Sequence, residues 1–120
     1  DNKIRVIIEI DETNKIPTHI FGKFFASAFS KYYMHENEEQ NKIEKNNKVL
    51  FIQVIKTDIV NERTSKRAQC EIIEDSVQKL LDKHPINGMN EYRILCGDIK
   101  DFENGEIREN LIKQIKIALD

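Results

Sequence analysis

Residues 1–17, DNKIRVIIEIDETNKIP, contain the segment that decides the fold. The apolar run from Ile4 to Ile10 predicts a β-strand that is buried on both faces. Successive residues of an extended chain point to opposite faces, so Glu9 and Asp11 are expected to share a face. That face is predicted to carry Arg5, Ile7, Glu9 and Asp11, and the other face Ile4, Val6, Ile8 and Ile10. Two carboxylates therefore emerge side by side where this strand ends.

The rest of the chain alternates between helical and strand-like patterns. Apolar residues at helical spacing predict three amphipathic helices, the first of which is entered near Pro17 and Thr18. Runs rich in β-branched and aromatic residues predict two further strands. The polar stretch from Glu36 to Lys48 predicts a solvated helix end and loop. The helices are expected over residues 17–33, 64–84 and 104–120, and the two further strands over residues 48–59 and 91–98.

The predicted order of elements is β-α-β-α-β-α. Long helical crossovers require parallel strands and right-handed connections. We therefore expect an α/β fold with three layers, in which a mostly parallel sheet carries helices on both faces. A length of 120 residues is enough for one compact domain, so residues 1–120 are expected to form a single domain. In such sheets the C-terminal ends of the strands share one edge, where ligands usually bind.

The composition restricts the class of protein. Charged residues make up 33% of the chain, but the formal net charge is only -2, so any basic surface for nucleic acid must be local. Cys70 and Cys96 lack the paired spacing of a disulfide framework and are expected to be reduced thiols. The chain has no apolar run long enough to span a membrane and no signal-peptide pattern. A soluble cytoplasmic protein is therefore expected.

The carboxylates of Glu9 and Asp11 allow two interpretations. Acidic residues are common where a strand leaves a sheet, and both side chains could simply be solvated. Alternatively, two carboxylates on one face, with a third from a neighbouring strand, could bind Mg²⁺, which uses few carboxylates and several waters. Such a site could activate water and stabilise the transition state of phosphoryl transfer.

The order of elements resembles the C-terminal part of the PD-(D/E)xK type II restriction endonucleases. The matching segments are the strand with Glu9-x-Asp11, the helix after it, the strand KVLFIQVIK, the helix containing KRAQCEIIEDSVQKLL and the strand YRILCGDIKDF. The chain is most similar to the branch in which the lysine of the motif is replaced, because Asp11 stands at that position. The family's first helix and leading hairpin strands have no counterpart in the sequence. We therefore expect the chain to be a fragment of a longer nuclease domain.

The resemblance implies a function and a set of site residues. The function is Mg²⁺-dependent hydrolysis of phosphodiester bonds in double-stranded DNA, as part of a restriction system. By the resemblance, Asp1 and Glu9 are metal ligands, and Asp11 is a catalytic residue at the variable third position.

The segment NERTSKR, residues 61–67, is a second candidate site. Basic residues at the start of a helix are ordinarily solvated surface. They are also suited to DNA, because lysine and arginine supply charge while serine and the backbone N–H groups of a helix N-terminus orient phosphates. The residues expected to bind nucleic acid are Arg63, Ser65, Lys66 and Arg67.

Two alternatives to the nuclease remain open. One is a non-catalytic α/β binding or assembly module, because an E-x-D tripeptide does not by itself specify chemistry. The other is a Toprim-like metal site in which Asp98 and Asp101 join Glu9, although their spacing places only one of them toward Glu9. A homodimer would suit the nuclease and the binding module alike, since a two-fold axis matches a palindromic DNA site.

Overall fold

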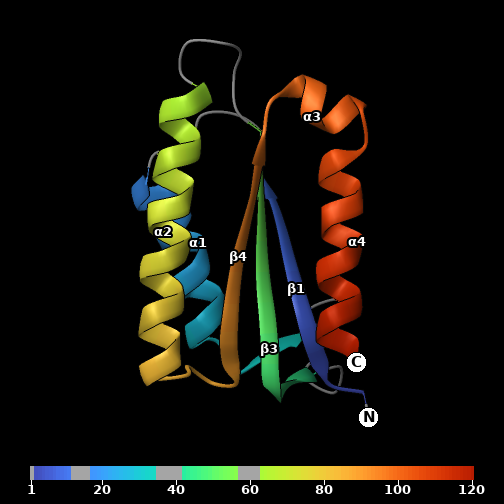
Figure 1. Ribbon diagram of the computed structural model, residues 1–120. Helices are drawn as coiled ribbons and strands as arrows, with labels where there is room; N and C mark the ends of the chain where they lie inside the picture. Colours follow the sequence, from blue (N-terminus) through green and yellow to red (C-terminus); the bar gives the residue numbers. More distant parts are fainter. Residues whose placement is uncertain (1, 12–16, 35–41, 57–62) are drawn as a thin grey trace.

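The computed structural model describes residues 2–11, 17–34, 42–56 and 63–120 (Figure 1). Each helix and strand expected from the sequence is present, together with an additional short strand and an additional short helix. The elements are β1 (Ile4–Asp11), α1 (Pro17–Phe29), β2 (Tyr32–Met34), β3 (Lys42–Lys56), α2 (Arg63–Lys83), β4 (Met89–Gly97), α3 (Ile99–Glu103) and α4 (Glu106–Leu119).

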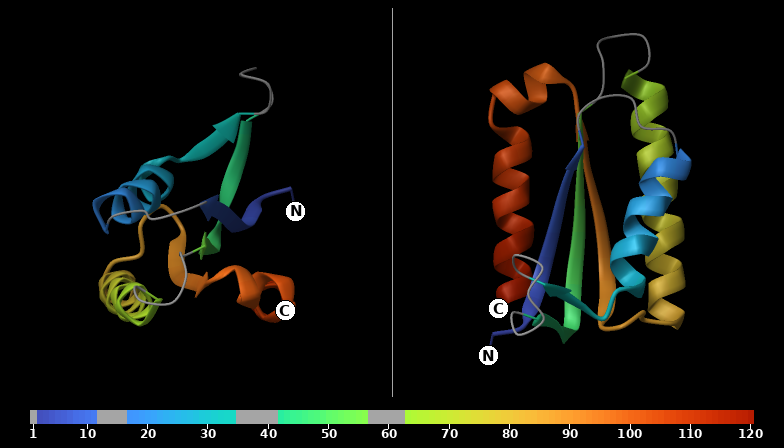
Figure 2. Two further views of the ribbon diagram at one scale, coloured as in Figure 1. Left: turned by 90° about the horizontal axis from the view of Figure 1, so that it is seen from above. Right: turned by 180° about the vertical axis from the view of Figure 1, so that it is seen from behind.

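β3 is the central strand of a four-stranded mixed sheet (Figures 1 and 2). Its C-terminal part pairs in parallel with β1 on one side and with β4 on the other, and Gln53 lies beside both Glu9 and Ile94. Its N-terminal end pairs with β2 in antiparallel orientation, with Tyr32 opposite Glu44. The C-terminal ends of the three parallel strands consequently meet at one edge, at the top of Figure 1.

The predicted three-layer, mostly parallel, restriction-endonuclease-like fold is therefore wrong. The sheet is mixed, and the order of elements is β-α-β-β-α-β-α-α rather than β-α-β-α-β-α. The difference arises at Tyr32 and Tyr33, which were expected in the first helix, and in the polar stretch from Glu36 to Lys48, which was expected to form a helix end and a loop. Tyr32–Met34 form β2, and β3 begins at Lys42. Tyrosine favours strands, and the polar start of β3 carries no apolar run that would mark it as a strand.

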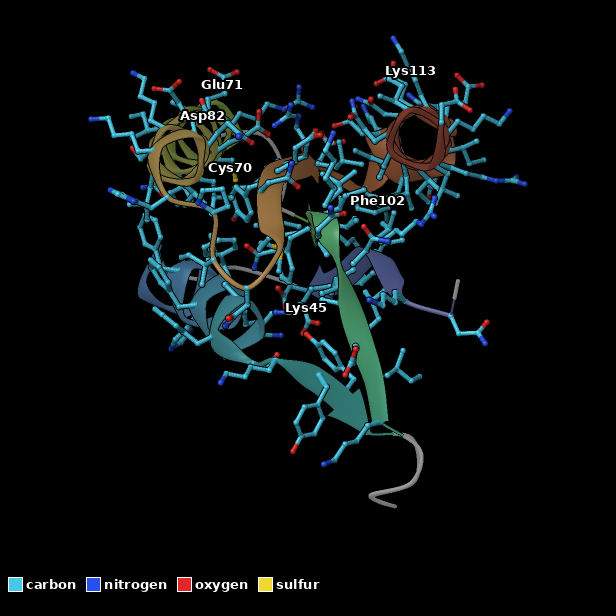
Figure 3. The ribbon with its side chains drawn as sticks, turned by 90° about the horizontal axis from the view of Figure 1, so that it is seen from below. Lys45, Cys70, Glu71, Asp82, Phe102 and Lys113 are labelled. Carbon is cyan, nitrogen blue, oxygen red and sulfur yellow. The ribbon has the colours of Figure 1, made fainter. Side chains whose placement is uncertain are left out.

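The end of α1 is fixed by contacts from distant parts of the chain. Lys45 of β3 lies between α1 and β3 in Figure 3, and its ammonium group donates hydrogen bonds to three backbone oxygens at the helix end. Asn87, in the turn before β4, donates to two oxygens there, at 3.2 Å each. These donors satisfy carbonyl groups that a helix leaves unpaired at its C-terminus. The helix therefore stops at Phe29, although its apolar stripe continues to Tyr33. The oxygens bound by Lys45 belong to Ser27, Ala28 and Ser30.

Two apolar clusters fill the two faces of the sheet. Helices α1 and α2 cover one face and α4 covers the other (Figures 1 and 2). Under α1, the Phe24 ring meets those of Phe51 and Tyr92 edge-on, with ring centroids 5.7 and 5.0 Å apart. On the α4 face, Phe102, labelled in Figure 3, packs against a cluster of buried residues from β3 and β4: Leu50, Ile52, Val54 and Leu95. The alternation of side chains along β3 supplies both clusters.

β1 is less buried than its sequence predicts. Among the described strands it pairs with β3 alone, so it lies at the edge of the sheet. Ile8 is 38% exposed and Ile10 is 67% exposed, while Ile7 packs against the cluster under α1 and α2. The prediction that the strand is buried on both faces is therefore wrong for Ile8 and Ile10, which lie in its C-terminal half on the face toward α4.

The contacts of Lys45 predict a large effect of its replacement. In Lys45→Met, three carbonyl groups at the end of α1 lose a charged donor, so the free energy of unfolding is expected to fall by about 2 kcal/mol. Urea denaturation near neutral pH measures the change. Lys48→Met is the matched control, because Lys48 is exposed on the same strand, and its effect is expected to stay within about 0.5 kcal/mol. Equal losses in the two variants would contradict the proposed cap.

Candidate functional site

Polar side chains gather at the C-terminal edge of the parallel strands, the edge at the top of Figure 1. β1 ends there with Asp11, and β4 ends there at Gly97, which is followed by Asp98. Lys23 reaches this edge from α1, and Arg67 reaches it from the N-terminal turns of α2. The described polar residues form two groups, one at the end of β1 and one at the end of β4.

Glu9 and Asp11 share the ammonium group of Lys23. Nζ of Lys23 lies 3.2 Å from Oε1 of Glu9 and also forms a hydrogen-bonded ion pair with Oδ1 of Asp11. The two carboxylates therefore lie on the same face of the sheet, as the alternation along the strand predicts. The side chain of Glu9 is 42% exposed, whereas that of Asp11 is 2% exposed. The hydrogen bond with Asp11, with a smaller contribution from Glu9, raises the pKa of Lys23 and keeps its amine charged.

A buried amide and a buried phenol lie on the same face as these carboxylates. Gln53, a polar interruption of an apolar strand, is fully buried and accepts a hydrogen bond from the hydroxyl group of Tyr92. Burial raises the pKa of Tyr92, and the nearby negative charge of Asp11 adds to this effect. The phenol therefore keeps its proton and acts as the donor. Because Oε1 of Gln53 accepts this hydrogen bond, the Nε2 atom of the same amide points away from Tyr92.

Asp98, Asp101 and Arg67 form the second polar group. The carboxylate of Asp98 accepts from the backbone N–H of Asp101 at 3.1 Å, and the carboxylate of Asp101 accepts from the backbone N–H of Asp98 at 3.0 Å. This reciprocal arrangement is a capping box at the start of α3. Arg67 pairs with Asp101 as well. A Cβ atom at Gly97 would lie 2.8 Å from Cβ of Asp101, so glycine is needed for the close approach. The two aspartates of the Toprim-like alternative thus have a structural role.

The fit of a magnesium ion depends mainly on Glu9. No group of three or more His, Cys, Asp or Glu side chains is placed to hold a metal ion in residues 2–11, 17–34, 42–56 and 63–120. Mg²⁺ in proteins is nevertheless usually held by one or two carboxylates and keeps several waters. Glu9 offers one exposed carboxylate of this kind, and it lies beside the ammonium group of Lys23. Asp1, the other expected ligand, lies outside the described residues.

The residues expected to bind nucleic acid are described only in part. Arg63, Ser65 and Lys66 belong to the first turn of α2, but their side chains lie outside the described part of the structure. Arg67 is described, and its guanidinium group binds Asp101. α2 begins at the edge of the sheet where β1 ends, so the basic segment and the carboxylates lie at the same end of the molecule (Figure 1).

Lys23 is the functional candidate that the sequence analysis missed. In the sequence it is one polar position among the aromatic residues of a helix, which normally indicates the solvent-facing side. The structure turns it toward β1, 12 positions after Asp11. The available signal was a lysine in the crossover helix directly after a strand that ends in two carboxylates, since such a helix packs back onto that strand.

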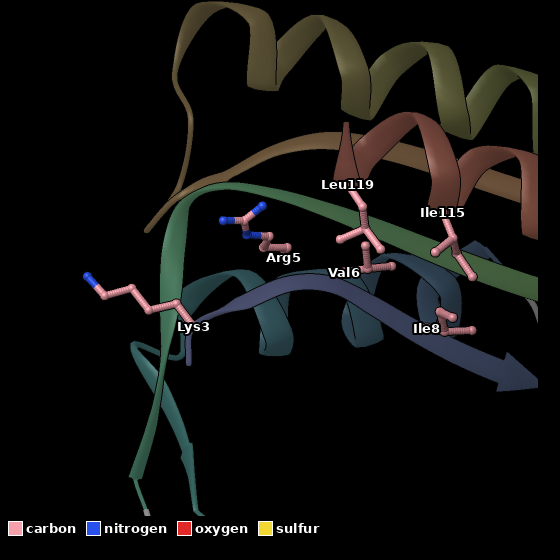
Figure 4. Close-up of a pocket in the computed structure, with 6 residues that line it drawn as sticks. All are labelled: Lys3, Arg5, Val6, Ile8, Ile115 and Leu119. Atoms are coloured by element: carbon pink, nitrogen blue, oxygen red, sulfur yellow. The ribbon is translucent and has the colours of Figure 1, made fainter. Parts of the chain in front are cut away.

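A wide groove lies away from the carboxylates, between β1 and α4 (Figure 4). Its volume is about 590 Å³, and Figure 4 shows Val6 and Ile8 facing Ile115 and Leu119. The expectation that Arg5 shares the face of Glu9 is wrong, because Arg5 lines this groove on the α4 side. The strand register shifts between Ile4 and Val6, and this irregularity breaks the alternation there. The groove contains no carboxylate among its described lining residues: Lys3, Arg5, Val6, Ile8, Ile115 and Leu119.

Both cysteines line a small hollow between α2 and β4, of about 130 Å³. Neither cysteine forms a disulfide, and Cys70 is buried against the sheet, on the inner side of α2 in Figure 3.

Comparisons with protein families, with curated proteins and with solved structures find no match for this chain. None of the described helices is long and apolar enough to cross a membrane. The fold and the site thus define a mixed α/β protein that carries a carboxylate–lysine cluster at the C-terminal edge of its parallel strands.

The ion pair between Lys23 and Asp11 predicts a specific pattern of stability. Lys23→Met leaves the buried carboxylate without its cation and is expected to lower the free energy of unfolding by about 2 kcal/mol, a value reduced by the partial exposure of the lysine. Adding Asp11→Asn removes the uncompensated charge, so the double variant should lose less than the sum of the two single variants. Chemical denaturation of all four proteins measures this cycle. Additive losses would show that the two side chains do not interact.

The raised pKa of Lys23 also predicts how this stabilisation depends on pH. A group whose pKa is higher in the folded protein stabilises it fully below the ordinary pKa of 10.5 and loses this effect as the pH rises through the folded value. The difference between wild type and Lys23→Met should therefore stay constant from about pH 6 to about pH 9 and shrink only above about pH 10.5. Thermal melting across this range measures it, and a difference that shrinks near neutral pH would contradict the assignment.

Proposed function

We propose that this chain carries the catalytic site of a Mg²⁺-dependent endonuclease that hydrolyses phosphodiester bonds in double-stranded DNA, in the manner of type II restriction enzymes. The observation that supports the proposal is the contact of one ammonium group, that of Lys23, with two carboxylates on one face of β1. Carboxylates for a cation and an ammonium group for a phosphate are the two kinds of group that this hydrolysis needs.

The different burial of the three side chains supports a separate role for each in this proposal. Glu9, which is partly exposed, would hold the metal ion together with Asp1. Mg²⁺, when bound, stabilises the negative charge on the phosphate as a Lewis acid. Asp11 is buried and bound to Lys23, so it fixes the position of the ammonium group. Lys23, at 37% exposed, stabilises the charge that develops on the phosphate oxygens. In the net reaction, one proton passes from the attacking water to the leaving oxygen.

In this proposal Lys23 takes the place of the lysine of the restriction-enzyme motif. Position 11 holds aspartate, whereas the family carries lysine there, and Lys23 brings an ammonium group to the side chain at that position. The charge required near the scissile phosphate is then delivered by α1 instead of by β1. This exchange supports the nuclease proposal more strongly than the E-x-D tripeptide alone.

DNA contacts are proposed for the start of α2. Arg63, Ser65 and Lys66 lie in its first turn, at the end of the molecule where β1 stops. Helix N-termini and basic side chains bind phosphates without reading the sequence of the bases. Arg67 contributes less directly, because Asp101 already pairs with it. The proposal includes a homodimer that matches a two-fold symmetric site, and a cytoplasmic location that suits two cysteines outside any disulfide.

A non-catalytic binding or assembly module is the second candidate. It is favoured by the same ion pairs, because Lys23 neutralises the carboxylates and one of them is buried. In that case Glu9 and Asp11 would serve only to anchor α1 to β1.

The exchange of a carboxylate for an amide distinguishes the two candidates. Glu9→Gln keeps the shape of the side chain and removes its charge, so Mg²⁺-dependent nicking of supercoiled plasmid is expected to fall by at least about 100-fold with an unchanged melting temperature. Glu91→Gln is the matched control, since Glu91 lies near the opposite end of the sheet, in the N-terminal part of β4, and its rate should equal that of wild type. A full-length wild-type protein that folds well and cuts no DNA with Mg²⁺ or Mn²⁺ would falsify the nuclease proposal.

The basic segment predicts a change in salt dependence. Arg63→Ala with Lys66→Ala should weaken binding to all DNA sequences about equally and reduce the slope of log affinity against log salt by about 2, since each phosphate contact contributes about 0.9. Titration of labelled DNA duplexes at several salt concentrations measures the slope. Lys113→Ala with Lys116→Ala is the control pair on α4, and no change in slope is expected for it. Identical slopes in both double variants would remove α2 from the DNA surface.

A further inference from the structure

The inference concerns two buried polar atoms beside the carboxylate–lysine cluster. Oδ2 of Asp11 and Nε2 of Gln53 are both buried, and neither has a hydrogen-bond partner in the part of the chain that the structure describes. A buried donor or acceptor without a partner is strongly destabilising, which is why such groups are almost always paired with protein or with ordered water. The two atoms also have complementary chemistry, because the amide donates and the carboxylate accepts.

The two side chains are neighbours on one face of the sheet. Gln53 of β3 lies beside Glu9 of β1, and Asp11 is the next residue of β1 on that face. Side chains in such diagonal positions are separated by about 7 Å at their Cα atoms, which leaves their polar ends within reach of one shared small molecule.

The orientation of each group is fixed from its other side. Oε1 of Gln53 accepts a hydrogen bond from the hydroxyl group of Tyr92, so Nε2 is the part of the amide left to donate toward β1. Oδ1 of Asp11 binds Lys23, so Oδ2 is the oxygen that remains. A donor on one strand and an acceptor on the next are thereby held in place by Tyr92 and Lys23.

We propose that one buried water molecule binds between Nε2 of Gln53 and Oδ2 of Asp11, and that Tyr92 and Gln53 act through it as positioning residues for Asp11. Water is the ligand that fits, because it accepts from the amide with its oxygen and donates to the carboxylate with a proton. An anion would be repelled by the carboxylate, and a metal ion would be repelled by the amide N–H group. The resulting chain is Tyr92, Gln53, water, Asp11 and Lys23.

The water site also predicts an effect on catalysis. This predicted effect rests on the proposed nuclease function, whereas the water site itself does not. Asp11 fixes the ammonium group of Lys23, so any group that orients the carboxylate also orients the cation that faces the substrate. Residues that orient such groups commonly change activity by about 10-fold to 100-fold when they are replaced. Gln53→Met should therefore lower the rate of cleavage by about 10-fold while the affinity for Mg²⁺, measured by calorimetry, stays unchanged.

The first test is structural. A crystal structure of the wild-type protein that resolves ordered waters should show one water oxygen within hydrogen-bond distance of both Nε2 of Gln53 and Oδ2 of Asp11. A direct hydrogen bond between the two side chains, or a protein group in that position, would overturn the proposal.

The second test is energetic and needs no enzymatic activity. The losses of stability in Gln53→Met and Asp11→Asn, measured by urea denaturation, should be non-additive because the two residues share one water. Glu9→Gln combined with Gln53→Met is the matched control, since Glu9 lies directly beside Gln53 but does not bind the water, and additive losses are expected. Additive losses in both pairs, or equal coupling in both, would overturn the proposal. If Gln53→Met does not fold, Tyr92→Phe takes its place, because it removes the proton that orients the amide and should couple to Asp11→Asn in the same way.

The outcomes separate this proposal from the nuclease. A wild-type protein that cuts no DNA but shows the bridging water and the selective coupling refutes the nuclease and leaves the water site standing. An active nuclease with additive losses in both pairs refutes the water site alone.

Discussion

The pairing of β3 with every other described strand is the constraint on which the structure depends. This strand runs for 15 residues, its C-terminal part lies between β1 and β4, and its N-terminal end extends beyond them to pair with β2. Its alternating side chains supply both apolar clusters, so α1 with α2 on one face and α4 on the other are packed against the same strand. The position of Glu9 beside Gln53, and therefore the geometry of the candidate site, follows from the same pairing.

Long polar side chains also hold the elements around β3 together. Lys45 of β3 closes the end of α1, Lys23 of α1 binds the end of β1, and Gln53 of β3 binds Tyr92 of β4. Each of these contacts joins two residues of different elements that lie at least 12 positions apart in the sequence. Because a buried polar group is costly unless it is paired, these contacts favour one arrangement of the elements over others that would bury the same apolar area.

The limits of the sequence analysis follow from the range of the interactions. The strand at Ile4, the long helix before Pro85 and the final helix were predicted because their patterns are local and periodic. The end of α1 and the hairpin of β2 were not, since they depend on Lys45 and on Asn87, which reaches a carbonyl group 59 positions away. The placement of Glu9 and Asp11 on the same face of the strand could be predicted from the alternation of side chains. Their shared cation could not, because the side of α1 on which Lys23 lies is decided by packing on the sheet.

The difference in burial between the two carboxylates bears most directly on function. If both served only to anchor α1, the partly exposed ion pair of Glu9 would add little, because such pairs contribute at most about 1 kcal/mol. The buried pair of Asp11 already holds the lysine, so a second acid on the solvent side is not needed for the fold. An exposed carboxylate next to a fixed, charged amine at the shared end of three parallel strands is instead an arrangement that can bind a cation and an anion at once. The nuclease proposal requires a rigid amine, and it accounts on that basis for the burial of Asp11 and for the buried Tyr92 and Gln53 on the same face of the sheet.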